Sequence, residues 1–164
     1  MDLEFKGNTI STLGKPLSVG EKFPDFTVLD KDNHEVHLTD LLDKPLLIST
    51  VPNIDTRVCS IQTKRFNQEV GTHSGINFVT ISTNTIEDQS HWCAAEGVEN
   101  MKMLSDVNHD FGKKSNLWVK DLDIIARSVW VVDQNQEITY SEIMPVQTDE
   151  PDYDQVLDQV NQMN

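Results

Sequence analysis

The two cysteines, Cys59 and Cys93, are the side chains of this 164-residue chain best suited to covalent chemistry. A chain of this length does not need a disulfide to be stable, and the sequence shows no sign of an oxidising compartment. Such a pair therefore indicates redox or nucleophilic chemistry. A lone cysteine is also commonly a small buried hydrophobe, so the surroundings of each thiol decide between the two interpretations.

Cys59 is expected in the first turn of a helix. The nearly continuous apolar run over residues 46–51 predicts a strand buried on both faces. Apolar residues then recur at helical spacing from about residue 56 to residue 70, with Asp55 or Thr56 as the N-cap. The sulfur would therefore lie near free backbone N–H groups, which stabilise a thiolate.

A helix terminus alone is too weak to keep a thiol ionised at neutral pH. Its dipole contributes about 0.3–1 kcal/mol, or ~2 kcal/mol in a partly buried site. Lowering the pKa of a thiol from ~8.5 to ~6 requires about 3.4 kcal/mol, at ~1.36 kcal/mol per pKa unit. A cation within about 4–6 Å supplies the difference. Arg57 and Arg127 are the arginines that we consider for this role.

The rest of the chain alternates predicted strands and helices, which indicates an α/β fold with a helix-covered sheet, parallel members and a closing hairpin. The expected elements are an N-terminal hairpin over 3–12 with a Gly7–Asn8 turn, strands over 26–30, 36–39, 46–51, 76–82, 101–105, 126–133 and 137–144, and helices over 56–70 (ended by Gly71), 87–96 (ended by Gly97) and from Pro151 or Asp152 onward. Residues 111–123 lack a clean periodicity and are expected to form a loop with one turn of helix. No linker or repeat interrupts the pattern, so we expect a single domain over residues 1–164.

Composition fits one globular domain and disfavours two classes of partner. Hydrophobic residues make up 37% of the chain, and 13 Lys and Arg against 27 Asp and Glu give a formal net charge of −14. Binding to nucleic acid or to an anionic membrane needs an excess of basic residues, so we expect neither partner. The sequence has no long apolar run and no signal-peptide pattern, which predicts a cytoplasmic protein.

No metal or cofactor is predicted. His34 and His37 form only a two-ligand fragment in an expected turn. The sequence also has no glycine-rich phosphate loop and no Cys-x-x-Cys pair, so nucleotide chemistry and thioredoxin-type exchange lack their usual anchors.

Several segments resemble the peroxiredoxin family, in particular its thiol peroxidase branch. Pro52-Asn-Ile-Asp-Thr56-Arg-Val-Cys59 resembles the family's Pro-x-x-x-Thr-x-x-Cys motif. The other similar segments are Lys64-Arg-Phe-Asn67, His91-Trp-Cys93-Ala-Ala-Glu-Gly97, Ala126-Arg127-Ser-Val-Trp-Val-Val-Asp133 and Glu150-Pro-Asp-Tyr153. They follow the family's order over essentially the whole chain.

This resemblance implies a thioredoxin-like fold, with a central mixed sheet, flanking helices and an N-terminal β-hairpin. It implies an antioxidant peroxidase that reduces hydrogen peroxide and organic hydroperoxides, with Cys59 as the peroxidatic and Cys93 as the resolving cysteine. The two would form an intramolecular disulfide that thioredoxin reduces. Thr56 would hydrogen-bond the peroxide or the sulfur, Arg127 would stabilise the thiolate and position the peroxide, and Pro52 would shield the sulfenic acid. The family also implies a homodimer with the active sites near the interface.

The sequence departs from the family at residues 84–88, Asn-Thr-Ile-Glu-Asp, where an apolar Leu-Pro-Phe-like piece is usual. A more polar wall there would favour smaller peroxides. Arg57 is also unusual for the family, and it is either a source of positive potential near the sulfur or a solvated surface arginine.

Three alternatives remain open. Cys93 could be an ordinary core residue, or an external thiol could resolve the oxidised Cys59. The protein could also be a redox-responsive binding protein that uses the same disulfide as a switch. If the two cysteines do bridge, their Cα atoms must come within about 7 Å, so we expect both helices to unwind partly on oxidation.

Overall fold

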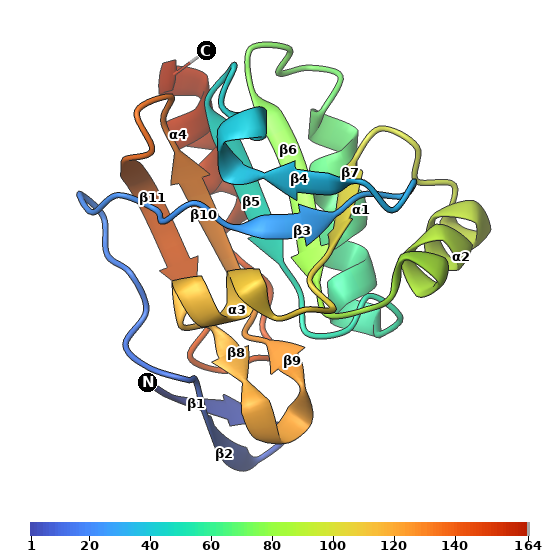
Figure 1. Cartoon of the computed structure of the whole chain (residues 1–164), viewed down its shortest axis with the longest axis vertical. Helices are drawn as coiled ribbons and strands as arrows, with labels where there is room; N and C mark the ends of the chain where they lie inside the picture. Colours follow the sequence, from blue (N-terminus) through green and yellow to red (C-terminus); the bar gives the residue numbers. More distant parts are fainter. Residues whose placement is uncertain (164) are drawn as a thin grey trace.

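A seven-stranded mixed sheet forms the centre of the molecule (Figure 1), with the strand order β11-β10-β5-β6-β7-β3-β4. The computed structural model describes residues 1–163. The strands are β3 (Thr27–Leu29), β4 (Glu35–His37), β5 (Leu46–Thr50), β6 (Asn77–Ser82), β7 (Lys102–Ser105), β10 (Ser128–Val132) and β11 (Ile138–Ile143). β5, β6 and β7 run parallel to one another, and the other neighbours are antiparallel. The predicted mixed sheet is confirmed.

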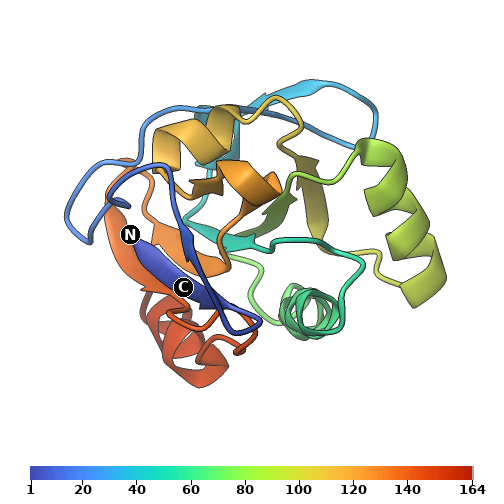
Figure 2. The ribbon, with the colours of Figure 1, turned by 90° about the horizontal axis from the view of Figure 1, so that it is seen from below.

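Helices lie on both sides of this sheet. They are α1 (Arg57–Glu69), α2 (Ile86–Glu96), α3 (Asp110–Ser115) and α4 (Tyr153–Met163), with short 3-10 turns η1 (Leu38–Leu41) and η2 (Lys120–Leu122). Figure 2 shows α1 and α4 on one side of the sheet, α3 on the other, and α2 out at one edge. Within residues 1–163, no helix is both long and apolar enough to span a bilayer.

The alternation of side chains along each strand divides the interior into two cores. In β5, Leu46 and Ile48 belong to the core on the α3 side, whereas Leu47 belongs to the core under α1 and α4. An aromatic cluster fills the first core, formed by Phe23, Phe26, Phe111 and Trp130. The second core contains Cys59, and Cys93 packs against it. Both cysteines therefore lie on the same side of the sheet.

The N-terminal hairpin is confirmed, with a different turn. β1 (Asp2–Phe5) pairs with β2 (Asn8–Ser11), and the turn residues are Lys6 and Gly7 rather than Gly7 and Asn8. Both have positive φ, +51° and +82°, the backbone twist that a two-residue hairpin requires. The hairpin is tied to the C-terminal part of the chain, because Glu4 forms a parallel bridge with Val146.

Two other sequence predictions are wrong in detail. Gly71 does not end α1, because the C-cap is Val70 with an ordinary helical backbone, whereas the predicted cap of α2, Gly97, is left-handed at φ +69°. The expected loop over 111–123 contains α3 and most of a small hairpin, β8 (Trp118–Val119) with β9 (Ile124–Ile125). These elements are too short to show a periodic pattern of apolar residues in the sequence. Gly112 permits their packing, since a Cβ there would lie 2.8 Å from Cβ of Trp118.

Candidate active site

Cys59 lies at the predicted place, in the first turn of α1 and directly after the strand–loop connection from β5. Thr56 is the N-cap by backbone conformation, with φ −102° and ψ 158°. Its side chain does not cap the helix, because Oγ1 donates a hydrogen bond to the carbonyl oxygen of Asn53 at 2.9 Å. Cys59 is 0% exposed, so the sulfur lies beneath the surface rather than on it.

The cation beside the sulfur is Arg127. Its Nη2 donates to Sγ of Cys59 at 3.2 Å, and the arginine itself is only 2% exposed. Arg127 directly precedes β10, whose first residue, Ser128, is paired with the last residue of β5, Thr50. The pairing of these two strands thus brings the arginine to the start of α1. Arg57, the other arginine considered, is exposed at the first position of that helix.

The other groups that hold the Arg127 guanidinium are neutral. Nη1 donates to Oε1 of Gln62 at 2.9 Å, and Nε donates to the main-chain carbonyl of Gln147 at 2.7 Å. Among the described residues, no carboxylate forms an ion pair with Arg127. A buried cation without a counter-charge is costly, and the sulfur of Cys59 is the remaining partner of this guanidinium.

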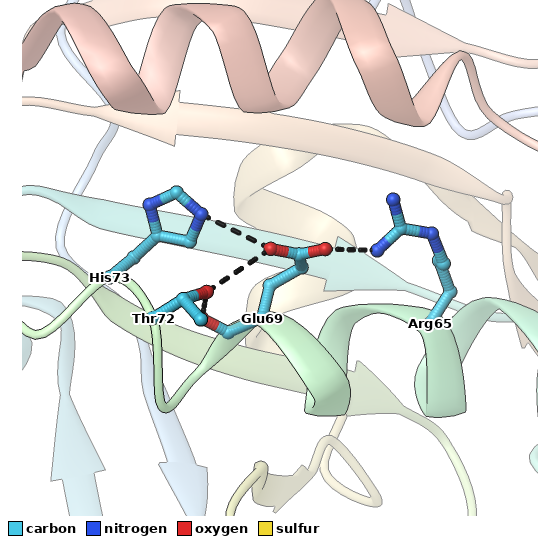
Figure 3. A network of polar contacts seen from close by, with 4 residues as sticks. All are labelled: Arg65, Glu69, Thr72 and His73. Atoms are coloured by element: carbon cyan, nitrogen blue, oxygen red, sulfur yellow. Dashed lines mark hydrogen bonds and ion pairs between the residues drawn. The ribbon is translucent and has the colours of Figure 1, made fainter.

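Arg65, on α1, shows the opposite arrangement, because its partner is a carboxylate (Figure 3). Arg65 pairs with Glu69, one turn later, and Glu69 also accepts hydrogen bonds from the hydroxyl of Thr72 and contacts Nε2 of His73 at 3.2 Å. The hydrogen bond from Arg65 is the main cause that lowers the pKa of Glu69, so this carboxylate is charged at neutral pH. The charge of Arg65 is therefore balanced within the network, whereas the charge of Arg127 is available to the sulfur.

Two glutamines that the sequence reasoning missed fix the arginine. Gln62 is 0% exposed, and its Nε2 donates to Oγ of Ser49 at 2.8 Å, which leaves its oxygen directed at Arg127. A signal for Gln62 existed, because a polar residue three positions after Cys59 falls on the buried face of the helix. Gln147 lies in an irregular segment between β11 and α4, where no periodic pattern marks a buried residue.

Asn84, in the segment that departs from the family, lies close to the motif and bonds to its loop. Its Oδ1 accepts a hydrogen bond from the backbone N–H of Ile54 at 2.9 Å, and its Nδ2 donates to Oδ1 of Asn53 at 3.1 Å. The amide of Asn84 therefore holds the loop between Pro52 and Thr56 from the neighbouring β6–α2 connection. Pro52 and Ile54 are buried in that loop.

Cys93 has a different environment. It is half-buried on α2, its thiol is free, and burial raises its pKa. It lines a groove of about 660 Å³ together with Met101, Met103 and residues 30–32. Cys59 is also free, so the predicted disulfide stays a prediction.

His34 and His37 do not share a site. His37 Nδ1 is hydrogen-bonded to the hydroxyl of Thr27 at 2.9 Å, while exposed His34 lies near Asp30 and Asp32 with ligand atoms within 4.8 Å of one another. An exposed acidic group of this kind is common without an ion.

Comparisons with known proteins identify the family of this chain. Residues 19–141 match the model of the AhpC/TSA family. Thiol peroxidase of Oceanobacillus iheyensis is 42% identical over 161 residues, which covers 98% of each chain. Thiol peroxidase of Bacillus subtilis is 37% identical over 158 residues, 96% of this chain and 95% of that protein.

Solved structures have the same fold. A peroxiredoxin-like protein from Aquifex aeolicus superposes with a TM-score of 0.92 at 29% identity, covering 99% of this chain and 97% of that one. Thiol peroxidase from Chromobacterium violaceum gives a TM-score of 0.88 at 17% identity over 98% and 96% of the two chains. The thioredoxin-like fold of the peroxiredoxins is thus confirmed. The chain belongs to the AhpC/TSA family and, within it, to the thiol peroxidase branch of the peroxiredoxins.

Proposed function

We propose that this thiol peroxidase reduces hydrogen peroxide and organic hydroperoxides through Cys59. The observation that carries the proposal is the 3.2 Å contact between Sγ of Cys59 and a buried arginine that has no acidic partner among the described residues. The thiolate attacks the distal peroxide oxygen, an S–O bond forms and the O–O bond breaks. The leaving oxygen takes up a proton and departs as water or alcohol, and the sulfur is oxidised to a sulfenic acid.

Thr56, Arg127 and Pro52 act on this step. The hydroxyl of Thr56 already donates to Asn53, so its free lone pairs are suited to accept a hydrogen bond from the peroxide. Arg127 stabilises the thiolate and the oxygen that gains charge in the transition state. Pro52 is buried in the loop that precedes α1 and shields the sulfenic acid. Because Cys59 has no exposed surface, the peroxide enters when this loop is displaced.

Cys93 completes the cycle. Its thiol condenses with the sulfenic acid, so that an S–S bond forms and water leaves. The dithiol of thioredoxin then reduces the disulfide by exchange, and both thiols are regenerated. Since Cys59 and Cys93 lie in separate helices, the first turn of α1 and the helix α2 unwind partly before they bridge. Hydrogen exchange at these two segments should rise on oxidation, and identical protection in the two forms would contradict the bridge.

The resemblance to the family also suggests the domain organisation, the cellular location and the oligomeric state. We infer a single peroxidase domain over residues 1–164 that acts as an antioxidant enzyme in the cytoplasm, as a homodimer. The net charge of −14 supports the absence of nucleic acid and membrane partners. Light scattering on the reduced protein tests the dimer.

Peroxide-dependent oxidation of thioredoxin, measured at low micromolar protein, tests the function. The wild type should turn over, and Cys59→Ser should not. Cys93→Ser should keep the first oxidation of Cys59 and lose turnover with thioredoxin. Turnover by Cys93→Ser would show that an external thiol resolves Cys59. No turnover by the wild type above Cys59→Ser would favour the redox-responsive binding protein.

A further inference from the structure

Both the main chain and the side chain of Gln147 form hydrogen bonds with Arg127, the arginine beside Cys59. We propose that Gln147 is a positioning residue for Arg127, and that the N-terminal hairpin holds Gln147 in place. The inference rests on the proposed function of Cys59 and Arg127. It adds Gln147, from an irregular segment, and the strand β1, which bonds to that segment.

The main-chain contact sets the direction of the guanidinium. Nε of Arg127 donates to the carbonyl oxygen of Gln147 at 2.7 Å, and Nη1 donates to Gln62 at 2.9 Å. A guanidinium is rigid and planar, so two fixed nitrogens also fix the third. Nη2 is thereby directed at Sγ of Cys59.

The side-chain contacts fix the backbone from which the arginine extends. Oε1 of Gln147 accepts a hydrogen bond from the backbone N–H of Arg127, and Nε2 donates to the carbonyls of Arg127 at 3.4 Å and of Met144 at 2.7 Å. Gln147 is 0% exposed, so water does not replace these bonds if they are lost. An amide supplies both donor and acceptor here without adding the negative charge that would compete with the thiolate for Arg127.

The hairpin secures this segment from outside. The backbone N–H of Gln147 donates to the carbonyl of Glu4 at 2.7 Å, and the N–H of Glu4 donates to the carbonyl of Pro145 at 2.8 Å. Leu3, on the same strand, is 4% exposed and belongs to the core, so β1 is itself anchored. A continuous series of hydrogen bonds thus runs from β1 through Gln147 to Arg127.

Three variants test the proposal, with the second-order rate constant for oxidation of Cys59 by hydrogen peroxide measured by stopped flow in the full-length protein. Gln147→Leu should lower this constant about 10- to 100-fold, in the range seen when a group that orients a charged catalytic donor is removed. It should also move the pH profile of Cys59 alkylation, recorded in a Cys93→Ser background, toward that of free cysteine. Glu4→Pro removes the N–H that bonds Pro145, together with the exposed side chain of Glu4, and it fixes φ at this position. It should lower the constant about 2- to 5-fold, the loss expected for one neutral hydrogen bond.

Gln147→Glu adds a signature that a merely structural residue would not give. At low pH the neutral carboxyl has a donor and an acceptor like the amide, and at high pH the carboxylate repels the facing carbonyls and pairs with Arg127. The ratio of its rate constant to that of the wild type should therefore fall as the pH rises. This variant also keeps the test decisive if Gln147→Leu does not fold.

Gln89→Leu is the matched control, because it removes another buried amide, one that donates to Oγ of Ser82 and to the carbonyl of Leu104. It should reduce stability without changing the peroxide rate constant or the alkylation profile. The inference would be overturned if folded Gln147→Leu had the rate constant and the pH profile of the wild type. It would also be overturned if the ratio of the Gln147→Glu rate constant to that of the wild type did not change with pH. Failure of wild-type Cys59 to react with peroxide would instead overturn the proposed function.

Discussion

The two cysteines lie on the same side of one sheet and differ in almost every other respect. Cys59 is fully buried and contacts a guanidinium that is held by neutral groups, whereas Cys93 is half-buried in a groove where burial raises its pKa. Burial favours the neutral thiol at Cys93, whereas Arg127 brings a positive charge to 3.2 Å from the sulfur of Cys59. Under the proposed function, this difference separates the reactivity of the peroxidatic cysteine from that of the resolving cysteine.

The helices that carry them differ in the same way. α1 buries Cys59, Gln62, Thr63 and Phe66, whereas α2 buries only Gln89 and Trp92. Figure 1 shows α2 at the margin of the molecule, beyond β7. A helix with few buried side chains opens at a lower free-energy cost than one packed into the core. The larger movement on oxidation is therefore expected in α2.

The largest effect is expected from Arg127. Arg127→Met removes the positive charge beside Cys59 and should lower the peroxide rate constant by about 10²–10³-fold, the loss typical of a deleted electrostatic stabiliser. Arg65→Met is the control, because Glu69 already balances the charge of Arg65. Stopped-flow oxidation measures both. Equal losses in the two variants would mean that general positive potential, rather than the contact with Sγ, activates the thiol.

The pH dependence of the two thiols should differ next most strongly. Because the pKa of Cys93 is raised, its alkylation in Cys59→Ser should still be increasing about tenfold per pH unit at pH values where free cysteine approaches its plateau. Alkylation of Cys59 in Cys93→Ser should reach its plateau at lower pH than free cysteine. Iodoacetamide labelling across the pH range, followed by mass spectrometry, records both curves. Superimposable curves would remove the distinction between the sites.

A smaller effect is expected at the loop between Pro52 and Thr56, which precedes the helix that carries Cys59. Asn84→Ala removes the hydrogen bonds to Ile54 and Asn53 and should lower the peroxide rate constant about 3- to 10-fold, since a displaced loop misplaces Thr56. Asn135→Ala is the control, because Asn135 is exposed in the turn between β10 and β11. A change in the preference between small and bulky hydroperoxides without a loss of rate would support the earlier expectation of a polar substrate wall.

The smallest effect is expected from the ion pair between α1 and α2, and it concerns the rate of disulfide formation. Nζ of Lys64 on α1 lies 2.7 Å from Oε2 of Glu96 on α2, and both side chains are about two-fifths exposed. Such a pair contributes about 0.2–1 kcal/mol, so Glu96→Gln should speed disulfide formation by a factor of about 1.5–5 at low salt. The gain should vanish at high ionic strength. Slower disulfide formation would show that α2 opens by another route.

Much of this arrangement is predictable from sequence, for identifiable reasons. The long apolar runs of β5 and β6 and the glycine that ends α2 indicate their elements within one or two residues. The prediction of a loop over residues 111–123 failed because a six-residue helix and two-residue strands are too short to show a periodic pattern of apolar residues. Their packing depends on the close approach of Gly112 to Trp118.

The site was predictable only in part. The expected position at a helix N-terminus indicated Cys59. The contact between its sulfur and Nη2 of Arg127, however, depends on the pairing of β10 with β5, which cannot be read from the spacing of residues along the chain. Electrostatic arithmetic required a cation without choosing between Arg57 and Arg127, and the family resemblance made that choice. Gln147 carried no signal, because its burial depends on the N-terminal hairpin and on a segment without regular structure.

Direct titration of the Cys59 thiol tests whether the contact with Arg127 activates this cysteine. The ultraviolet absorbance of the thiolate is recorded against pH in Cys93→Ser, with the double variant Cys59→Ser/Cys93→Ser as the blank. We expect the Cys93→Ser variant to show thiolate absorbance at neutral pH, and we expect this absorbance to be lost when Arg127 is also replaced by Met. A signal that appears only in the alkaline range where free cysteine ionises, at about pH 8.5, would contradict this expectation.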